Sequence, residues 1–355
     1  MVAWDDAPAL VFAPAGGGKT TMRIYTARSC WVGLGGYHPF PIPYVLPKYI
    51  TINRAPSLDE HLTAIVQAGV VALLMSLRFR PEAFLALDKA DRRALAATLD
   101  RSFPGPLPYY LEMLREDGTQ ALASLVDGAY VLPNPPAPSV LHELCAELEA
   151  ALLSKPASFT ASTPRAHFEE LVALLRGPLG FRSVFVLLDG VDAFPETMAD
   201  PAVAAEWVAP LLLEAANWAR QHVLIKAFLP IDTQPPLTDL IADVLPSMRQ
   251  ARLEWTPGLL AEVIRKRVYV ASGGEIGSLD AISGPGLLDL ETILMKSTPP
   301  LPREAIVLVR RVLFEYTQRA DGNSGRLEPS DVEAAVKWYQ RNQVWPASES
   351  TTIAP

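Results

Sequence analysis

A segment near the start of the chain combines three glycines with a lysine and a threonine. Gly16, Gly17 and Gly18 are consecutive, and two side chains suited to phosphate and metal chemistry follow directly. The glycines let the backbone curl so that successive N–H groups point toward one anion. Lys19 would then reach phosphate oxygens, and the Thr20 hydroxyl would bind Mg²⁺. Together these residues predict a loop that holds the phosphates of ATP.

The residues around this loop fit the same interpretation. The apolar run Leu10–Phe12 predicts a buried strand, and a helix is expected over about 20–31. Such a helix would direct the positive end of its dipole at a bound phosphate. The residues expected to contact the nucleotide in this segment are Pro14, Ala15, Gly16, Gly17, Gly18, Lys19, Thr20 and Thr21.

The segment departs in one place from the pattern G-x-x-x-x-G-K-[ST] of nucleotide-binding P-loops. Ala13 stands where the first glycine is expected, although Gly18, Lys19 and Thr20 complete the pattern. Alanine is the smallest side chain available there, but a position with positive φ would disfavour it. The alternative interpretation is a glycine-rich turn that only links a strand to a helix.

A second segment with chemical potential lies far along the chain. Val184–Leu188 is apolar throughout, which predicts a central parallel strand buried on both faces, and Asp189 follows it. Ligands of open α/β sheets bind at the carboxyl ends of the strands. We therefore expect Asp189 to hold Mg²⁺ beside a phosphate loop on a neighbouring strand, and Asp192 to orient the attacking water. Alternatively, Asp189 only caps the turn that follows it.

The composition excludes several classes of protein. The 355 residues are 50% hydrophobic, which is ample for a sizeable core. Two cysteines, Cys30 and Cys145, make no disulfide framework and favour a reducing, cytoplasmic setting. Apolar runs such as Ala68–Met75 are too short to span a bilayer, so we expect no membrane contact. A net charge of −8 disfavours nucleic acid as a partner without excluding it.

The order of the expected elements indicates an α/β fold. A lateral strand is expected over Ile42–Ile50, because its prolines suit a sheet edge. Ser57 opens an S-x-x-E capping box, which predicts the start of a helix. Two more strands are expected over His222–Leu229 and Arg252–Trp255, with helices between them. We predict a doubly wound core with a mainly parallel sheet and a helical insertion at about 80–155.

Beyond Thr256 the hydrophobic periodicity is entirely helical. The expected helices are Pro257–Ser272, Gly286–Lys296, Pro302–Arg319 and Pro329–Trp345. The chain is thus predicted to consist of a P-loop NTPase core at 1–255, an all-helical lid domain at 256–345 and a flexible tail at 346–355.

With both motifs in place, the sequence resembles the P-loop ATPases of the AAA+ and STAND type. The most specific parts of the resemblance are Gly16–Thr20 and the block Leu-Leu-Asp189-Gly-Val-Asp192, which is similar to the STAND form of the Mg²⁺-binding motif. The helical lid is similar to the one that follows the core in both groups. Within it, Leu301-Pro302-Arg303-Glu304 resembles a motif whose proline or arginine touches the nucleotide phosphates, which implies this role for Arg303.

The resemblance implies roles for three further cations. A residue at the end of the strand after Asp189 senses the γ-phosphate in these families, and Lys226 is the nearest polar candidate. The alternative for Lys226 is an edge lysine whose stem reaches out to water. The segment before the last strand resembles one that carries an arginine finger, which implies that Arg249 or Arg252 acts on the γ-phosphate of a neighbouring subunit. Each arginine has the alternative of being an ordinary surface residue.

Three functions of different classes remain open. The first is a slowly ATP-hydrolysing switch that forms a homo-oligomer and controls a partner or effector protein. The second is an AAA+ ring ATPase that loads or remodels nucleic acid or protein, and the third is a non-catalytic nucleotide-binding scaffold. A motor usually carries a glutamate directly after the metal-binding aspartate, whereas this chain has Gly190. Asp192 would have to serve in its place, which favours slow turnover and hence the switch.

Overall fold

The computed structural model describes residues 5–32, 39–51, 54–115, 136–154, 163–319 and 325–342. The chain divides into two units. The first consists of Met1–Pro14 and Lys19–Arg252, and the second consists of Ala15–Gly18 and Leu253–Pro355.

A five-stranded sheet lies at the centre of the first unit. Its strands are β1 (Ala9–Ala13), β2 (Phe40–Val45), β3 (Val184–Asp189), β4 (Val223–Pro230) and β5 (Arg249–Arg252). Their order across the sheet is β2-β3-β4-β1-β5, and every neighbouring pair runs parallel. Strands β1 and β3 are buried along their whole length, as expected of apolar strands covered by helices. The predicted α/β fold with a parallel sheet is confirmed.

Strand β2 forms one edge of the sheet, as its prolines predict. The backbone N–H of Phe40 donates to the carbonyl of Ser183 at 2.8 Å. Because alternate residues of a parallel strand face the same neighbour, Pro41 and Pro43 fall on the open side, where no N–H is needed. The strand ends at Val45 rather than at the predicted Ile50, and a short helix, α2 (Leu46–Tyr49), follows it.

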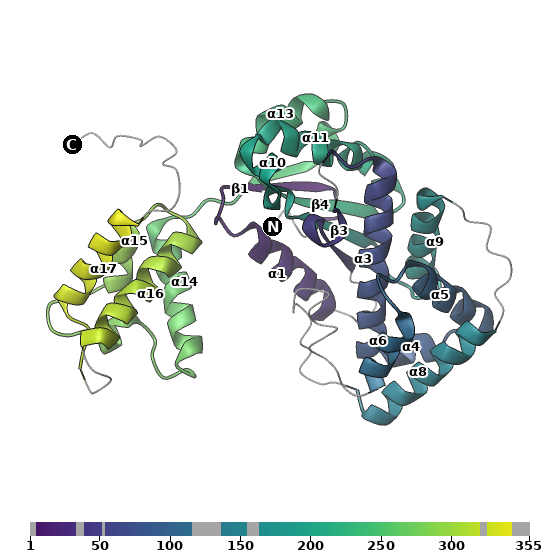
Figure 1. The fold of residues 1–355 in the computed structure, drawn as a ribbon, viewed down its shortest axis with the longest axis horizontal. Coiled ribbons are helices and arrows are strands. Elements are labelled where there is room, and N and C mark those ends of the chain that lie inside the picture. The colour runs from purple at the N-terminus through teal and green to yellow at the C-terminus, as the bar shows by residue number, and fades with distance from the viewer. Residues whose placement is uncertain are drawn as a thin grey trace. The chain divides into compact units, whose positions relative to one another are not determined.

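Helices cover both faces of the sheet (Figure 1). Helix α1 (Lys19–Val32) packs on one face against β1, β2, β3 and β4, whereas α11 (Pro201–Leu212) and α13 (Gln234–Leu240) lie on the other. The other connecting elements are α9 (Pro164–Arg176), α10 (Pro195–Ala199), α12 (Ala215–Arg220), η2 (Val191–Ala193), η3 (Ile231–Thr233) and η4 (Leu245–Ser247). Because all strands are parallel, the carboxyl ends of β1 and β3 share one edge of the sheet.

Helix α3 (Leu58–Phe79) begins at the predicted capping box. The Ser57 side chain accepts a hydrogen bond from the backbone N–H of Glu60, and the Glu60 carboxylate accepts one from the N–H of Ser57. Helix α3 packs against β2 and α9. By length and composition it is the one described helix that passes for a membrane span, but 83% of its most apolar window is buried inside the protein. Burial of this kind is typical of a core helix.

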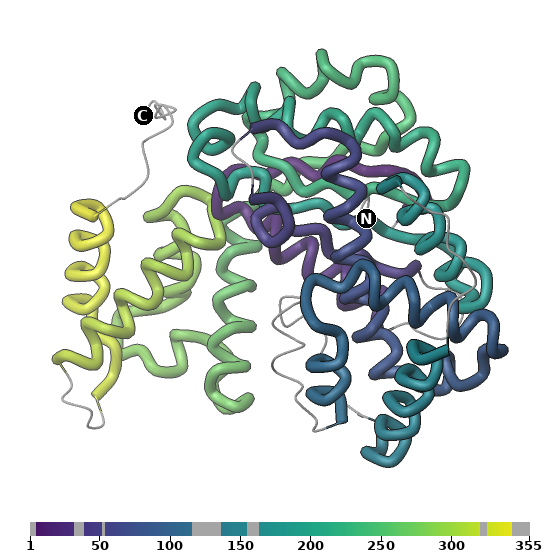
Figure 2. Tube along the Cα trace, turned by 45° about the vertical axis from the view of Figure 1, so that its right-hand side comes forward, coloured from purple at the N-terminus to yellow at the C-terminus, as the bar shows by residue number. Residues whose placement is uncertain are grey.

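A group of helices lies between α3 and β3 along the chain (Figure 2). Its members are α4 (Pro81–Leu85), α5 (Lys89–Ser102), α6 (Leu107–Arg115) and α8 (Pro138–Leu153). Helix α8 contacts the other three, and both views show the four side by side. They fall within the range predicted for a helical insertion, of which residues 116–135 and 155 lie outside the described part of the chain.

The second unit is mainly helical over its described residues. Its elements are α14 (Pro257–Ala271), η5 (Leu279–Ile282), α15 (Leu290–Lys296), α16 (Pro302–Arg319) and α17 (Pro329–Arg341). Leu260, Leu294 and Leu308 pack with other apolar side chains into a core of the unit's own. Helix α15 begins at Leu290 rather than at the predicted Gly286. The predicted tail, 346–355, lies outside the described residues, as do residues 343–345 of the last expected helix.

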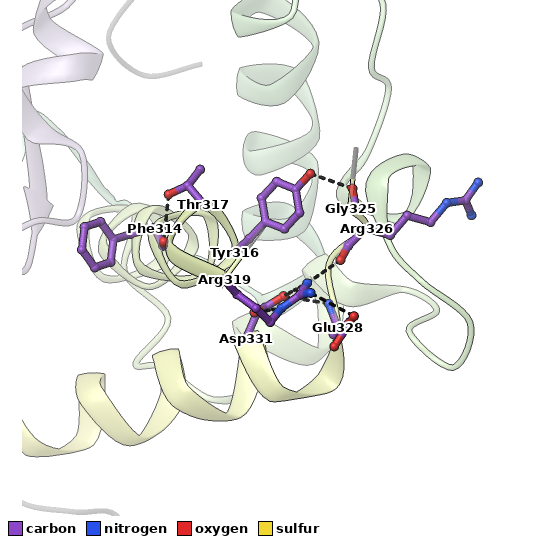
Figure 3. A network of polar contacts seen from close by, with 8 residues as sticks. All are labelled: Phe314, Tyr316, Thr317, Arg319, Gly325, Arg326, Glu328 and Asp331. Atoms are coloured by element: carbon purple, nitrogen blue, oxygen red, sulfur yellow. Dashed lines mark hydrogen bonds and ion pairs between the residues drawn. The ribbon is translucent and has the colours of Figure 1, made fainter. Parts of the chain in front are cut away.

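An ion-pair network joins α16 to the start of α17 (Figure 3). Nε and Nη2 of Arg319 donate to the two carboxylate oxygens of Asp331, each at 2.8 Å. Nη1 of Arg319 donates to Glu328, and Nη2 also donates to the carbonyl of Arg326. Paired hydrogen bonds of this kind are short and directional. The bonds from Arg319 hold the pKa of Asp331 below its ordinary value.

Candidate functional site

The glycine loop joins β1 to α1. Strand β1 ends at Ala13 and α1 begins at Lys19, so the residues between them form a tight turn. Gly16 and Gly18 have φ angles of +74° and +97°, which residues with side chains rarely adopt. Ala13 belongs to the strand and is not among the residues with positive φ. The alanine in place of the first glycine of the pattern therefore causes no backbone strain.

Lys19 lies in the first turn of α1 and is almost fully buried. Its side-chain nitrogen Nζ lies 3.0 Å from Oδ2 of Asp192, and the residue is 6% exposed. The same ammonium group donates to the backbone carbonyls of Ala13 and Pro14, each at 3.4 Å. The lysine expected to bind phosphate and the aspartate expected to orient water thus meet, although they come from segments far apart in the sequence.

Asp189 is the last residue of β3 and is 2% exposed. Its Oδ1 accepts the backbone N–H of Gly190 at 2.8 Å, which is the local turn contact of the alternative interpretation. Its Oδ2 accepts a hydrogen bond from Nε of Arg23 at 3.0 Å, and the Thr20 hydroxyl also bonds to the carboxylate. Burial raises the pKa of Asp189 above its ordinary value, against the effect of these three neighbours. Two of its partners thus lie on α1.

The two motif strands are not direct neighbours, which corrects the expectation from the sequence. Strand β4 lies between β1 and β3, and its Ala227 pairs with Leu10 on one side and with Leu188 on the other. Helix α1 spans this gap, because it packs across β1, β4 and β3. The first turn of α1, rather than strand adjacency, brings Thr20 to Asp189.

Thr20 and Asp189 offer a donor set that suits Mg²⁺. A hydroxyl and a carboxylate side by side are hard oxygen ligands, and Mg²⁺ takes its other ligands from water and substrate phosphates. Over the part of the chain that the structure describes, no group of three or more His, Cys, Asp or Glu side chains gathers into a metal cage. A site with one carboxylate and one hydroxyl therefore fits a metal that arrives with a nucleotide, and Thr20 and Asp189 would hold it.

Arg23 belongs to this site, although it lies outside both sequence motifs. The side chain is 1% exposed and its Nε is bonded to Asp189. The signal in the sequence is its spacing: Arg23 follows Lys19 by four residues, which puts both cations on one face of a helix. That face is directed at the sheet, so both side chains are buried.

Gly190 directly follows Asp189, and the backbone explains why it is glycine. Its φ angle is +83°, in the left-handed region that favours glycine. A Cβ atom added there would lie 2.8 Å from Cδ of Pro47, which is closer than real Cβ contacts. The local fold therefore disfavours any side chain, a glutamate included, directly after Asp189.

Lys226 does not reach the edge where Lys19 and Asp189 lie. It is the fourth residue of β4, which continues to Pro230, and it pairs with Ala9 at the amino end of β1. Its Nζ donates to the carbonyls of Asp5 and Ala7 and lies 4.8 Å from the centre of the Phe185 ring. Burial lowers the pKa of Lys226 to about 8.

Both interpretations of Lys226 from the sequence are therefore wrong. The lysine is fully buried in the middle strand of the sheet, so it is not an edge residue that reaches water. It also lies at the amino end of β1, away from the carboxyl edge that a γ-phosphate sensor requires. Two backbone carbonyls and an aromatic face satisfy its charge in place of water.

Arg249 and Arg252 are the two ends of β5, which begins three residues earlier than predicted. Arg249 pairs with Ala9 and Arg252 pairs with Phe12, so the two lie about 10 Å apart along the strand. Both are exposed, and Arg252 donates from Nε and Nη2 to the Gln234 side chain at 3.0 and 2.6 Å. The structure does not bring the two arginines together.

Within the second unit, two side chains lie against the segment Ala15–Gly18. The indole Nε1 of Trp255 donates to the carbonyl of Gly17 at 2.8 Å. A Cβ atom added at Gly16 would lie 3.0 Å from Cβ of Arg303, so the arginine of the expected lid motif is beside the loop. Trp255 follows β5 and is not part of it, contrary to the predicted strand.

The chain was compared with protein-family models, with curated proteins and with solved structures. No family model, no curated protein and no solved structure matches it.

Proposed function

We propose that this chain binds ATP with Mg²⁺, hydrolyses it slowly, and acts as a nucleotide-dependent switch that oligomerises to control a partner protein. One observation carries the proposal: Lys19 and Thr20 at the start of α1 adjoin Asp192 in η2 and Asp189 at the end of β3. A cation for phosphate, a hydroxyl and a carboxylate for metal, and a second carboxylate are the groups that nucleotide hydrolysis requires.

Slow turnover is the part of the proposal that distinguishes a switch from a motor. A glycine with positive φ stands at residue 190 in place of a glutamate, so Asp192 is the carboxylate expected to orient water. That carboxylate is already paired with Lys19. A base that must share its charge with a neighbouring ammonium is weaker, which supports a switch over a ring ATPase that loads or remodels its substrates.

The first test is equilibrium binding of a fluorescent ATP analogue in the presence of Mg²⁺. Lys19→Ala removes the phosphate cation and should weaken binding by about tenfold to a hundredfold. The matched control is Lys89→Ala, since Lys89 is an exposed lysine at the start of α5. Unchanged affinity in a folded Lys19→Ala variant would remove the basis for nucleotide binding.

The second test separates a switch from a non-catalytic scaffold. Phosphate release under single-turnover conditions measures hydrolysis directly, and the mass of the protein with ADP or a non-hydrolysable ATP analogue measures assembly. A switch should release phosphate and change its oligomeric state between the two nucleotides. Tight binding with no phosphate release would favour the scaffold.

A further inference from the structure

Two cations on α1 face two carboxylates, one at the end of β3 and one in the following turn η2. Lys19 and Arg23 are four residues apart, which places them on the same side of the helix. Lys19 pairs with Asp192 and Arg23 pairs with Asp189, both at 3.0 Å. The second pair is the more deeply buried, because Arg23 and Asp189 are 1% and 2% exposed.

The Arg23 guanidinium uses the carboxylate that the proposed function assigns to the metal. Oδ2 of Asp189 accepts from Arg23, and Oδ1 accepts from the N–H of Gly190. With the Thr20 hydroxyl also bonded to it, the carboxylate serves three donors, and a divalent cation at Asp189 would have to share its roughly four lone-pair sites with them. It would also lie a few ångströms from a buried positive charge, where water and salt screen repulsion weakly.

We propose that Arg23 sets the Mg²⁺ affinity of this site by competing with the metal for the Asp189 carboxylate. The inference rests on the proposed ATP and Mg²⁺ site and adds a determinant that the motif residues do not include. Arg23 is a positioning residue: it acts on the metal through Asp189. Metal binding would weaken or break the hydrogen bond from Nε of Arg23 to Oδ2 of Asp189. The position of Arg23 on α1 would therefore depend on whether the metal is bound.

The test compares Arg23→Met with wild type. Methionine keeps much of the buried volume and removes the charge. Mg²⁺ is titrated into protein that already holds a fluorescent ATP analogue, and the apparent Mg²⁺ dissociation constant is measured. Arg23→Met should bind Mg²⁺ at least about tenfold more tightly, because both the competitor and its repulsion are gone. The matched control is Arg28→Met on the exposed side of the same helix, which should change the constant by less than about twofold.

The outcomes distinguish this inference from the function on which it rests. If wild-type protein fails to bind the analogue both in Mg²⁺ and in EDTA, the nucleotide site itself is lost. If wild type binds the analogue, and folded Arg23→Met shows unchanged or weaker Mg²⁺ affinity, only the role of Arg23 is overturned. A merely structural role for the arginine predicts a lower unfolding temperature with no gain in metal affinity.

A second measurement covers the case in which Arg23→Met does not fold. The Nε–H signal of Arg23 is followed by NMR in wild-type protein, and Arg23→Lys, which keeps the charge, assigns it by the loss of that signal. Competition predicts that the signal moves when Mg²⁺ is added to the complex with the ATP analogue. A signal that stays in place under these conditions would contradict the inference.

Discussion

Lys19 Nζ lies 3.0 Å from Oδ2 of Asp192, and the two side chains differ in exposure: 6% for the lysine and 31% for the aspartate. The lysine is therefore held inside the protein while its partner reaches solvent. In the proposed function a nucleotide phosphate and Asp192 are two anions that draw on one ammonium group. This competition predicts that a substitution at Asp192 has opposite effects on nucleotide affinity and on the rate of hydrolysis.

Asp192→Asn should raise the affinity for ATP and lower the rate of hydrolysis. Removing the carboxylate frees Lys19, and loss of a partly exposed ion pair corresponds to roughly 1 kcal/mol, or about fivefold in affinity. Loss of the group that orients water should slow single-turnover hydrolysis by about a hundredfold. Equilibrium binding and single-turnover rates measure the two effects separately. A variant that binds ATP more weakly would show that Asp192 supports binding.

Gly190→Ala should destabilise the first unit without supplying any catalytic group. The backbone has φ +83°, and the new Cβ would lie 2.8 Å from Pro47, so we expect a loss of about 1–3 kcal/mol in the free energy of unfolding. Gly180→Ala is the matched control, since Gly180 also has a positive φ of +69° but has no atom within 4 Å of an added Cβ. Denaturant unfolding of both variants separates backbone strain from the clash. Equal losses of unfolding free energy in the two variants would mean that Pro47 moves aside and that the clash adds nothing to the backbone strain.

The stability of the first unit should fall between pH 6.5 and about 4 because of His61. Its Nε2 donates to the carbonyl of Trp207 at 2.8 Å, and its Nδ1 accepts from the Tyr44 hydroxyl at 2.7 Å. Burial lowers the pKa of His61 from 6.5 to about 4. The unfolded chain therefore takes up a proton in this range before the folded protein does, which lowers the free energy of unfolding by about 3 kcal/mol.

Replacement of this histidine tests the assignment. His61→Gln should flatten the dependence of unfolding free energy on pH between 4.5 and 6.5. The same substitution at exposed His142 should leave the dependence unchanged. If both variants keep the wild-type slope, another group must titrate in this range.

Arg249→Ala should remove the part of the hydrolysis rate that depends on protein concentration. An arginine supplied to a neighbouring subunit contributes roughly 10³-fold or more to turnover, and it contributes only in an oligomer. Arg252→Ala is the informative comparison, because Arg252 is bonded to Gln234 and lies three residues along the strand. Mixing Arg249→Ala with Lys19→Ala should restore some activity, since each protein supplies what the other lacks. A monomeric protein with a constant specific rate would rule out a trans-acting arginine.

The sequence by itself determined the elements whose causes are local. The Ser57 capping box and the prolines of β2 act on the backbone of neighbouring residues, and the apolar run of β3 is contained in one short segment. Each is seen as predicted. Positive φ at Gly16 and Gly18 is local in the same sense. The sequence predicts the candidate phosphate and metal residues because they lie in two short segments with recognisable residue types and spacing.

The tertiary structure decided everything that depends on strand order and burial. The order of the sheet places β4 between β1 and β3, which no local periodicity specifies. That order buries Lys226 in the middle strand. It also lets α1 bring Arg23 to Asp189, although the two residues are distant in sequence. Hydrophobic patterning tells a strand which faces to bury, but it carries no information about which strand becomes its neighbour. The pairing of site residues therefore emerges only when the sheet is assembled.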